Sequence, residues 1–148
     1  RIDRMGVAVP DQVTAPELDG REQEPWLIVE GLRLDPEDES AICVSTVHIS
    51  RDFAAIAPDL KSHTGAIYSL IEERFGVQVA DVEQHISALH MPAEAARALG
   101  LSRKVWAVRV VRLYRDGDGR LMLVSVNYHP ADRFTYTMHL KREGRGFG

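Results

Sequence analysis

The sequence has very little cysteine: Cys43 is the only one among 148 residues. A single cysteine cannot form a disulfide within its own chain, and without neighbouring cysteines it cannot build a zinc site of the usual kind. Cys43 lies in an apolar, strand-like run. We therefore interpret it as a small buried hydrophobic residue, with a reactive thiol as the alternative reading.

Long apolar runs are also absent. No stretch approaches the roughly 20 apolar residues that a membrane-spanning helix needs, and no signal-peptide pattern is present. We therefore expect a cytoplasmic protein without membrane contact. The chain begins at Arg1 rather than at a methionine, so we expect it to be part of something longer.

The familiar catalytic motifs are missing as well. The sequence contains no Gly-rich phosphate loop, no G-x-S-x-G, no H-E-x-x-H and no Cys-x-x-Cys. His85 and His90 are five positions apart on a predicted strand and so face opposite sides, and the acidic run at 35–39 lacks the ligand spacing of an EF-hand. We expect no metal, no cofactor and no catalytic residues. A net charge of −4 and a pI of about 5.9 also make unaided DNA binding improbable.

The length and composition of the chain fit one compact domain, because 45% of its 148 residues are hydrophobic. Residues 104–142 predict three consecutive strands, at 104–115, 120–129 and 132–142. Asp-Gly pairs at 116–119 join the first two, and such pairs tolerate the positive φ of a hairpin turn. The third strand alternates, with these apolar residues on one face: Phe134, Tyr136, Met138 and Leu140.

The rest of the chain adds hairpins and short helices. We read residues 1–24 as a linker or poorly ordered arm, 25–143 as the domain and 144–148 as a tail. Within the domain, the patterns predict strands at 26–34, 40–50 and 79–90, helices at 66–75 and 92–99, and a short helical or irregular connection at 51–63. This order predicts an α+β fold: about six mostly antiparallel strands with helices on one face.

Two stretches resemble a known family. Residues 64–72 (TGAIYSLIE), followed by Phe75-Gly76, are similar to the "GSLY-x-x-L-E…YG" helix of the UTRA domain. Residues 109–119, then Ser125, Tyr128 and 132–134, resemble that domain's "R-x-x-Y-D-x-D-G-x-P-V-E-x-S…Y-R-G-D-R-Y" ending. The alanine-rich run before it is matched by Ala88, Ala95, Ala96 and Leu99. The likeness covers roughly residues 26–142.

The UTRA domain is the effector-binding domain of HutC-subfamily GntR transcription regulators. The resemblance implies a chorismate-lyase-like fold with a six-stranded antiparallel sheet. It implies that a small metabolite binds the domain and that the regulator is a homodimer. Operator DNA would be contacted only through a winged-helix domain that precedes this domain and is absent from the chain.

The family's ligand-binding positions are only partly kept. Sugar-phosphate-binding members have Arg-x-Arg on the first strand, where this chain has Gly31 and Arg33. Ser45 stands where they have a glutamate, and Ala66 where they have a serine. Leu123 replaces a second glutamate and His129 a tyrosine. The residues that the resemblance and strand parity assign to the site are Arg33, Ser45, His48, Gly65, Ala66, Ile67, Tyr68, Leu123, Ser125, His129 and Arg133.

These replacements predict the class of ligand. Arg33 and the backbone N–H groups of residues 65–67 suffice for one anionic group at a helix start. A leucine at 123 removes an acceptor for sugar hydroxyls, so we expect a small anionic effector with a partly apolar body. Two alternatives remain: a domain that only dimerises, and a chorismate-lyase-like enzyme. Ser45 and Leu123 are not acids, which disfavours the enzyme.

Overall fold

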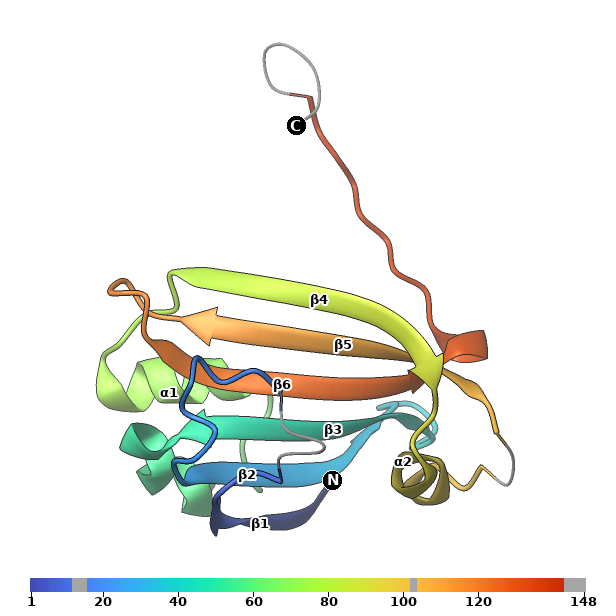
Figure 1. Ribbon diagram of the computed structural model, residues 1–148, viewed down its shortest axis with the longest axis horizontal. Coiled ribbons are helices and arrows are strands. Elements are labelled where there is room, and N and C mark those ends of the chain that lie inside the picture. Colours follow the sequence, from blue (N-terminus) through green and yellow to red (C-terminus); the bar gives the residue numbers. More distant parts are fainter. Residues whose placement is uncertain (12–15, 102–103, 143–148) are drawn as a thin grey trace.

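The computed structural model describes residues 1–11, 16–101 and 104–142 (Figure 1). Six strands form one antiparallel sheet in the order β1-β2-β3-β6-β5-β4. The strands are β1 (Ile2–Ala8), β2 (Trp26–Leu34), β3 (Ala41–Ser50), β4 (Asp81–His90), β5 (Trp106–Arg115) and β6 (Leu121–Pro130). The helices are the 3₁₀ segment η1 (Arg51–Asp59), α1 (Ile67–Phe75), α2 (Ala93–Ala98) and the short 3₁₀ turn η2 (Ala131–Arg133).

One face of the sheet, which we call the α1 face, is covered by η1 and α1. Side chains from β2, β3 and β6 pack there against the two helices, because alternate residues of each strand are apolar. Leu70 and Ile71 are the buried residues of α1, and Ile56 is the buried residue of η1. This main core consists of Leu27, Val29, Val47, Ile49, Ile56, Leu60, Leu70, Ile71, Met122 and Leu123.

The opposite face is covered by α2 and by the segment that enters β2. Leu18 is fully buried and packs with Trp26 against β5 and β6. Ala95 of α2 packs in a separate cluster with residues of β5 and of the β4–α2 connection. The expectation that the helices share one face is therefore wrong: α1 and α2 lie on opposite faces. The sequence pattern of a helix shows which of its own sides is apolar, not which side of a sheet it meets.

The predicted hairpin between β5 and β6 is confirmed in detail. The Asp116 carboxylate accepts hydrogen bonds from the backbone N–H groups of Asp118 and Arg120, each at 2.9 Å. Gly119 adopts a φ of +80°, which a glycine accepts without steric cost. The predicted end of the first helix is also confirmed, because Gly76 follows α1 in the left-handed region.

The stretch 1–24, expected to be a linker or poorly ordered arm, contains a strand, while its residues 12–15 and the expected tail at 144–148 lie outside the described residues. Residues 2–8 form β1, which pairs antiparallel with β2 and supplies one edge of the sheet. Ile2 and Met5 pack against the main core. Charged residues and a glycine hide this strand in the sequence. An edge strand needs only one apolar row and accepts charges elsewhere, so its pattern resembles that of a linker.

The predicted strand at 132–142 is not formed. Residues 131–133 make η2, and the described residues beyond it have no regular secondary structure. The apolar row expected to be buried is exposed, at 51% for Tyr136 and 60% for both Met138 and Leu140. Figure 1 shows this segment running away from the sheet. Alternation predicts the faces of a strand, but a strand also needs a partner, and the described chain offers this segment none.

Candidate functional site

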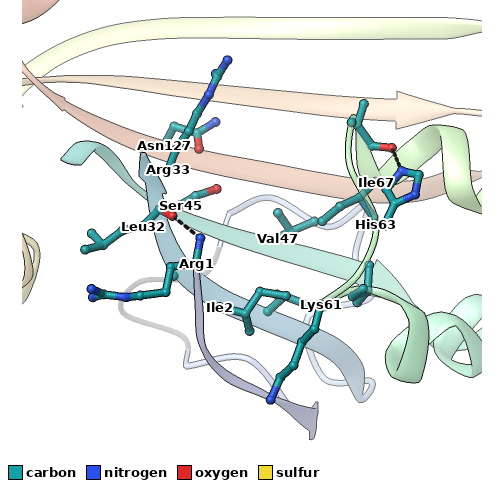
Figure 2. Close-up of a pocket in the computed structure, with 15 residues that line it drawn as sticks. Arg1, Ile2, Leu32, Arg33, Ser45, Val47, Lys61, His63, Ile67 and Asn127 are labelled. Carbon is teal, nitrogen blue, oxygen red and sulfur yellow. Dashed lines mark hydrogen bonds between the residues drawn. The ribbon is translucent and has the colours of Figure 1, made fainter. Parts of the chain in front are cut away.

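A cavity of about 880 Å³ opens on the α1 face, between the sheet and the loop that leads into α1 (Figure 2). Strands β2, β3 and β6 form its floor, and the start of β1 borders it. The lining residues are Arg1, Ile2, Val29, Gly31, Leu32, Arg33, Ser45, Val47, Leu60, Lys61, His63, Gly65, Ala66, Ile67 and Asn127. Both the floor and the loop combine apolar and polar groups.

The polar groups of the floor are brought together by strand register. Gly31 pairs with Ser45, and Ser45 pairs with Asn127 on the next strand. Paired residues of antiparallel strands point to the same face, so the Ser45 hydroxyl and the Asn127 amide lie side by side. Arg33, two residues beyond Gly31, shares that face, and both Arg33 and Asn127 line the cavity (Figure 2). The floor thus offers a guanidinium, a hydroxyl and an amide.

The opposite wall is the loop before α1. The Nε2 atom of His63 lies 3.1 Å from the carbonyl oxygen of Ala66. A carbonyl oxygen only accepts, so Nε2 carries the proton and donates it, which ties the loop to the helix start. Gly65 adopts a φ of +114° within this loop, a conformation that favours glycine.

The start of α1 itself lacks a side-chain cap. Ala66 occupies the N-cap position and makes no side-chain hydrogen bond to the first turn. The first N–H groups of a helix have no partner within the helix, and the helix dipole adds about half a positive charge there. The α1 start therefore presents donors to the cavity that an anion can accept.

The charge of the lining has one sign. Arg1, Arg33 and Lys61 border the cavity, and none of its described lining residues is an aspartate or a glutamate. Arg1 is paired with Asp3 at 2.8 Å. In the described part of the chain, Arg33 and Lys61 make no ion pair. The cavity is therefore positive and suited to an anionic group.

Five of the residues expected from the sequence line this cavity together: Arg33, Ser45, Gly65, Ala66 and Ile67. Arg33 and Ser45 come from neighbouring strands, and the other three come from the helix start. Their convergence follows from the fold, since the loop before α1 returns over β2 and β3.

Three further expected residues lie on the same side of the sheet but outside the lining of the cavity. Leu123 is 3% exposed and belongs to the main core, so it does not form a wall of the cavity. Tyr68 packs at the edge of that core, and its ring stacks on Tyr114 with centroids 5.3 Å apart. Ser125 is buried on the same face, where it pairs in register with Val47 of β3 and Arg112 of β5.

His48 lies on the opposite face of the sheet. It is separated from Ser45 by three positions, and residues an odd number apart on a strand point to opposite sides. His48 is 5% exposed and borders a second cavity, of about 660 Å³, between β1–β3, β6 and α2. Burial lowers the pKa of its imidazole to about 4, and its Nδ1 atom has no hydrogen-bond partner among the described residues. His48 is neutral at physiological pH.

The last two expected residues lie towards the end of β6. His129 shares the face of Asn127, but it lies outside the lining of the cavity and packs against Phe134 with centroids 4.9 Å apart. Burial lowers the pKa of His129, and the positive charges of Arg33 and Arg112 lower it further. Arg133 is exposed in η2 and lies away from the cavity.

The sequence reasoning missed Lys61 and His63. Both precede the predicted helix start, whose N–H groups were expected to bind an anion, and a basic residue beside such a start is a usable signal. Asn127 has the same strand parity as Ser125 and His129, so parity is a usable signal for it as well. In the parts of the chain that are described, no cluster of three metal-binding side chains occurs, and none of the helices has the length and hydropathy to cross a bilayer.

Known proteins share this sequence pattern and this fold. Residues 4–135 match the profile of the UTRA domain. No curated protein sequence matches the chain significantly.

Solved structures give the fold. A GntR-family transcriptional regulator from Enterococcus faecalis V583 superposes with a TM-score of 0.77 at 20% identity, covering 94% of this chain and 98% of that one. The ligand-binding domain of a Bordetella bronchiseptica protein assigned to the same regulators superposes with a TM-score of 0.78 at 18% sequence identity. The match covers 95% of this chain and 89% of that one. YydK from Bacillus subtilis, described as a possible transcriptional regulator, superposes with a TM-score of 0.79 at 15% sequence identity. This chain is covered over 95% of its length there but spans only 60% of YydK. The expected chorismate-lyase-like α+β fold is confirmed.

Proposed function

This chain belongs to the UTRA domain family, and on that premise we propose that it is the effector-sensing domain of a GntR-type transcription regulator of the HutC subfamily. It binds a small metabolite in the cavity on the α1 face and acts as a homodimer. Operator DNA is contacted through a winged-helix domain that precedes Arg1 in the full regulator. The ligand-binding domain from Bordetella bronchiseptica, with a similar fold, supports this assignment.

The observation that carries the proposal is the charge pattern of the cavity. Arg33 on the floor, Lys61 on the loop and a helix start without a side-chain cap all border the cavity, and no carboxylate lies among the described lining residues. A charge-assisted hydrogen bond to arginine is roughly twice as strong as a neutral one. The cavity therefore selects a carboxylate or a phosphate.

The remainder of the lining defines the body of the ligand. Val29, Val47 and Ile67 present apolar surface, while Ser45 and Asn127 are the neutral polar side chains. A sugar phosphate needs an acceptor for each of several hydroxyls, and this lining lacks the carboxylates that would supply them. We therefore propose an anionic effector with a partly apolar body. The apolar character comes from lining residues such as these three rather than from Leu123, which lies in the main core.

The position of β1 suggests how occupancy is signalled. Arg1 and Ile2 border the cavity, and β1 is the first element after the expected DNA-binding domain. A ligand that draws Lys61 and the α1 start towards Arg33 also changes the surroundings of Arg1. Ligand binding would thereby bias the orientation of the preceding domain, which is a coupling between two sites.

A thermal-shift screen of small carboxylic and phosphoric acids tests the proposal. A ligand present at 100 times its Kd raises the free energy of unfolding by about 2.7 kcal/mol. Arg33→Ala should abolish the shift, whereas Arg97→Ala, an exposed arginine of α2 on the other face, should leave it unchanged. A screen in which no acid shifts the melting temperature would favour the domain that only dimerises.

A further inference from the structure

Strand β4 is an open edge of the sheet. Among the described elements it pairs only with β5, so the backbone groups along its outer side have no partner strand. Almost all of its residues are exposed, and the apolar Val82 and Ile86 have exposed fractions of 47% and 42%. Exposed edges of this length invite pairing with a further strand.

The segment after η2 has the form of a strand without a sheet. Phe134 is held against His129 of β6, with ring centroids 4.9 Å apart. Beyond it the described chain extends away from the body (Figure 1). Tyr136, Met138 and Leu140 alternate with polar residues and are more than half exposed. Three large apolar side chains on one side of an extended segment are costly to leave in water.

We propose that residues 136–141 of one protomer pair with β4 of a second copy of this chain, and that the second copy returns the same contact. The pairing is antiparallel, with Tyr136 opposite Ile86 and Leu140 opposite Val82. Each sheet thereby gains a seventh strand. Reciprocal exchange of this kind closes the assembly at two copies by two-fold symmetry.

The side chains fix this direction and register. In the antiparallel arrangement, the apolar row of the segment continues the apolar positions of β4 on the α1 face. The alternate residues then bring Lys141 opposite Asp81, so opposite charges meet on the other face, and His139 opposite Glu83, whose carboxylate can accept a hydrogen bond from the imidazole. A parallel arrangement would carry Lys141 to the far end of β4, away from both carboxylates. Cross-strand pairs of opposite charge stabilise a sheet, and like pairs destabilise it.

The segment cannot easily reach β4 of its own protomer. Because the strand order is β6-β5-β4, a chain leaving β6 must cross about three strand spacings, or roughly 14 Å, to lie outside β4. The three residues of η2 are coiled in a 3₁₀ turn and rise only about 6 Å. Phe134 is in addition anchored beside β6. A second copy therefore fits the edge better than the segment's own β4 does.

This inference rests on the proposed function only in taking a homodimer as the assembly. It concerns a surface distant from the effector cavity, so its success or failure is independent of ligand binding.

Disulfide trapping between separately prepared variants tests the exchange. Thr137 and His85 lie opposite each other in the proposed register and are both exposed. When Thr137→Cys protein is mixed with His85→Cys protein and oxidised, we expect a covalent dimer of about twice the 16.6 kDa chain. Thr137→Cys mixed with Glu37→Cys, whose cysteine lies in the β2–β3 turn, is the matched control and should give none. Equal trapping in both mixtures would overturn the proposal.

The variant that carries both Thr137→Cys and His85→Cys separates exchange from folding back. Exchange predicts covalent dimers at low protein concentration, whereas an intramolecular disulfide in a monomer would contradict the proposal. Truncation after Phe134 should convert a dimer to a monomer in light scattering while the circular dichroism spectrum stays unchanged. A truncated chain that remains dimeric would overturn the exchange and leave the proposed homodimer standing. A full-length chain that is monomeric would overturn both.

Charge reversal tests the register. Lys141→Glu should weaken the dimer about three- to tenfold, and adding Asp81→Lys to the same chain should restore it. Failure of the double variant to recover would contradict the proposed pairing of these two residues.

Discussion

The carbonyl oxygen of Arg1 lies 2.0 Å from the position that a Cβ atom on Gly31 would occupy. The start of β1 therefore runs directly over Gly31, and the same oxygen accepts a hydrogen bond from the N–H of Leu32 at 2.9 Å. In the sugar-phosphate pattern this position holds the first of two arginines. The backbone of β1 takes the space that such a side chain needs, which leaves Arg33 as the arginine contributed by β2 to the cavity.

This contact predicts that Gly31→Ala destabilises the domain. The added methyl group must displace backbone atoms, and overpacking of this kind costs about 1 to 3 kcal/mol. Gly6→Ala is the matched control, because it also lies in a β1–β2 pair but would meet nothing within 4 Å. Urea denaturation of the two variants measures the difference. Equal free energies of unfolding would show that β1 does not pack over Gly31.

His48 predicts a loss of stability in mild acid. The pKa of its imidazole is about 4 in the folded domain and about 6.5 in an unfolded chain. Between these values the unfolded state binds the proton more readily, so the free energy of unfolding falls as the pH drops from 6.5 towards 4. Neutral His48 makes its full contribution to the free energy of unfolding above pH 6.5. Roughly 2 kcal/mol of that contribution should be lost at pH 5.

Comparison with His48→Gln isolates this effect from the other titrating groups. Denaturation at pH 7.5 and at pH 5 should show a larger loss for the wild type than for the variant, by about the same 2 kcal/mol. If both proteins lose equal stability, His48 does not remain neutral in the folded domain.

Substitutions of Leu123 and Ser45 should affect different properties, the first the stability of the domain and the second its affinity for ligand. Leu123→Ala removes a buried core side chain and should lower the free energy of unfolding by about 2 to 5 kcal/mol. Ser45→Ala changes a half-buried residue of the cavity floor and should barely alter stability. Ligand affinity should respond in the opposite way, falling for Ser45→Ala and holding for Leu123→Ala when both are folded. Calorimetry on the two variants checks this, and a large loss of affinity with Leu123→Ala alone would contradict the placement of the site.

Residues 1–148 alone should not bind DNA. The chain has a net charge of −4, and neutralising phosphates requires clustered basic groups. A gel-shift titration at low salt should show no complex at micromolar protein. A complex that weakens steeply with added salt would mean that this domain contacts operator DNA directly.

Local signals in the sequence predicted much of this fold. Gly76 marks the end of α1, and the Asp-Gly turn at 116–119 marks the β5–β6 hairpin, because both depend on backbone conformations that few residues accept. The edge strand β1 was missed since its stability comes from pairing with β2, a contact between residues far apart in the chain. The segment at 134–140 has the pattern of a strand, yet pattern alone does not supply a partner.

The sequence also named part of the lining of the candidate cavity, and the role of those residues in binding stays a prediction. Arg33, Ser45 and the α1 start were named from the family resemblance, and the structure places them together at the cavity. His48 was assigned to the wrong side because its odd spacing from Ser45 was not applied. Lys61 and His63 were missed because only the folded loop shows that they border the cavity.

Arg33 provides the most direct test of the account. Isothermal titration calorimetry should compare aromatic and aliphatic carboxylates with glucosamine-6-phosphate, on the wild type and on Arg33→Ala. We expect an acid with an apolar body to bind the wild type more tightly than the sugar phosphate does. Loss of a hydrogen bond to a charged group costs about 1.5 to 3 kcal/mol, so Arg33→Ala should weaken that binding by roughly 10- to 150-fold. Tight binding of the sugar phosphate that survives Arg33→Ala would contradict both the ligand class and the anchor.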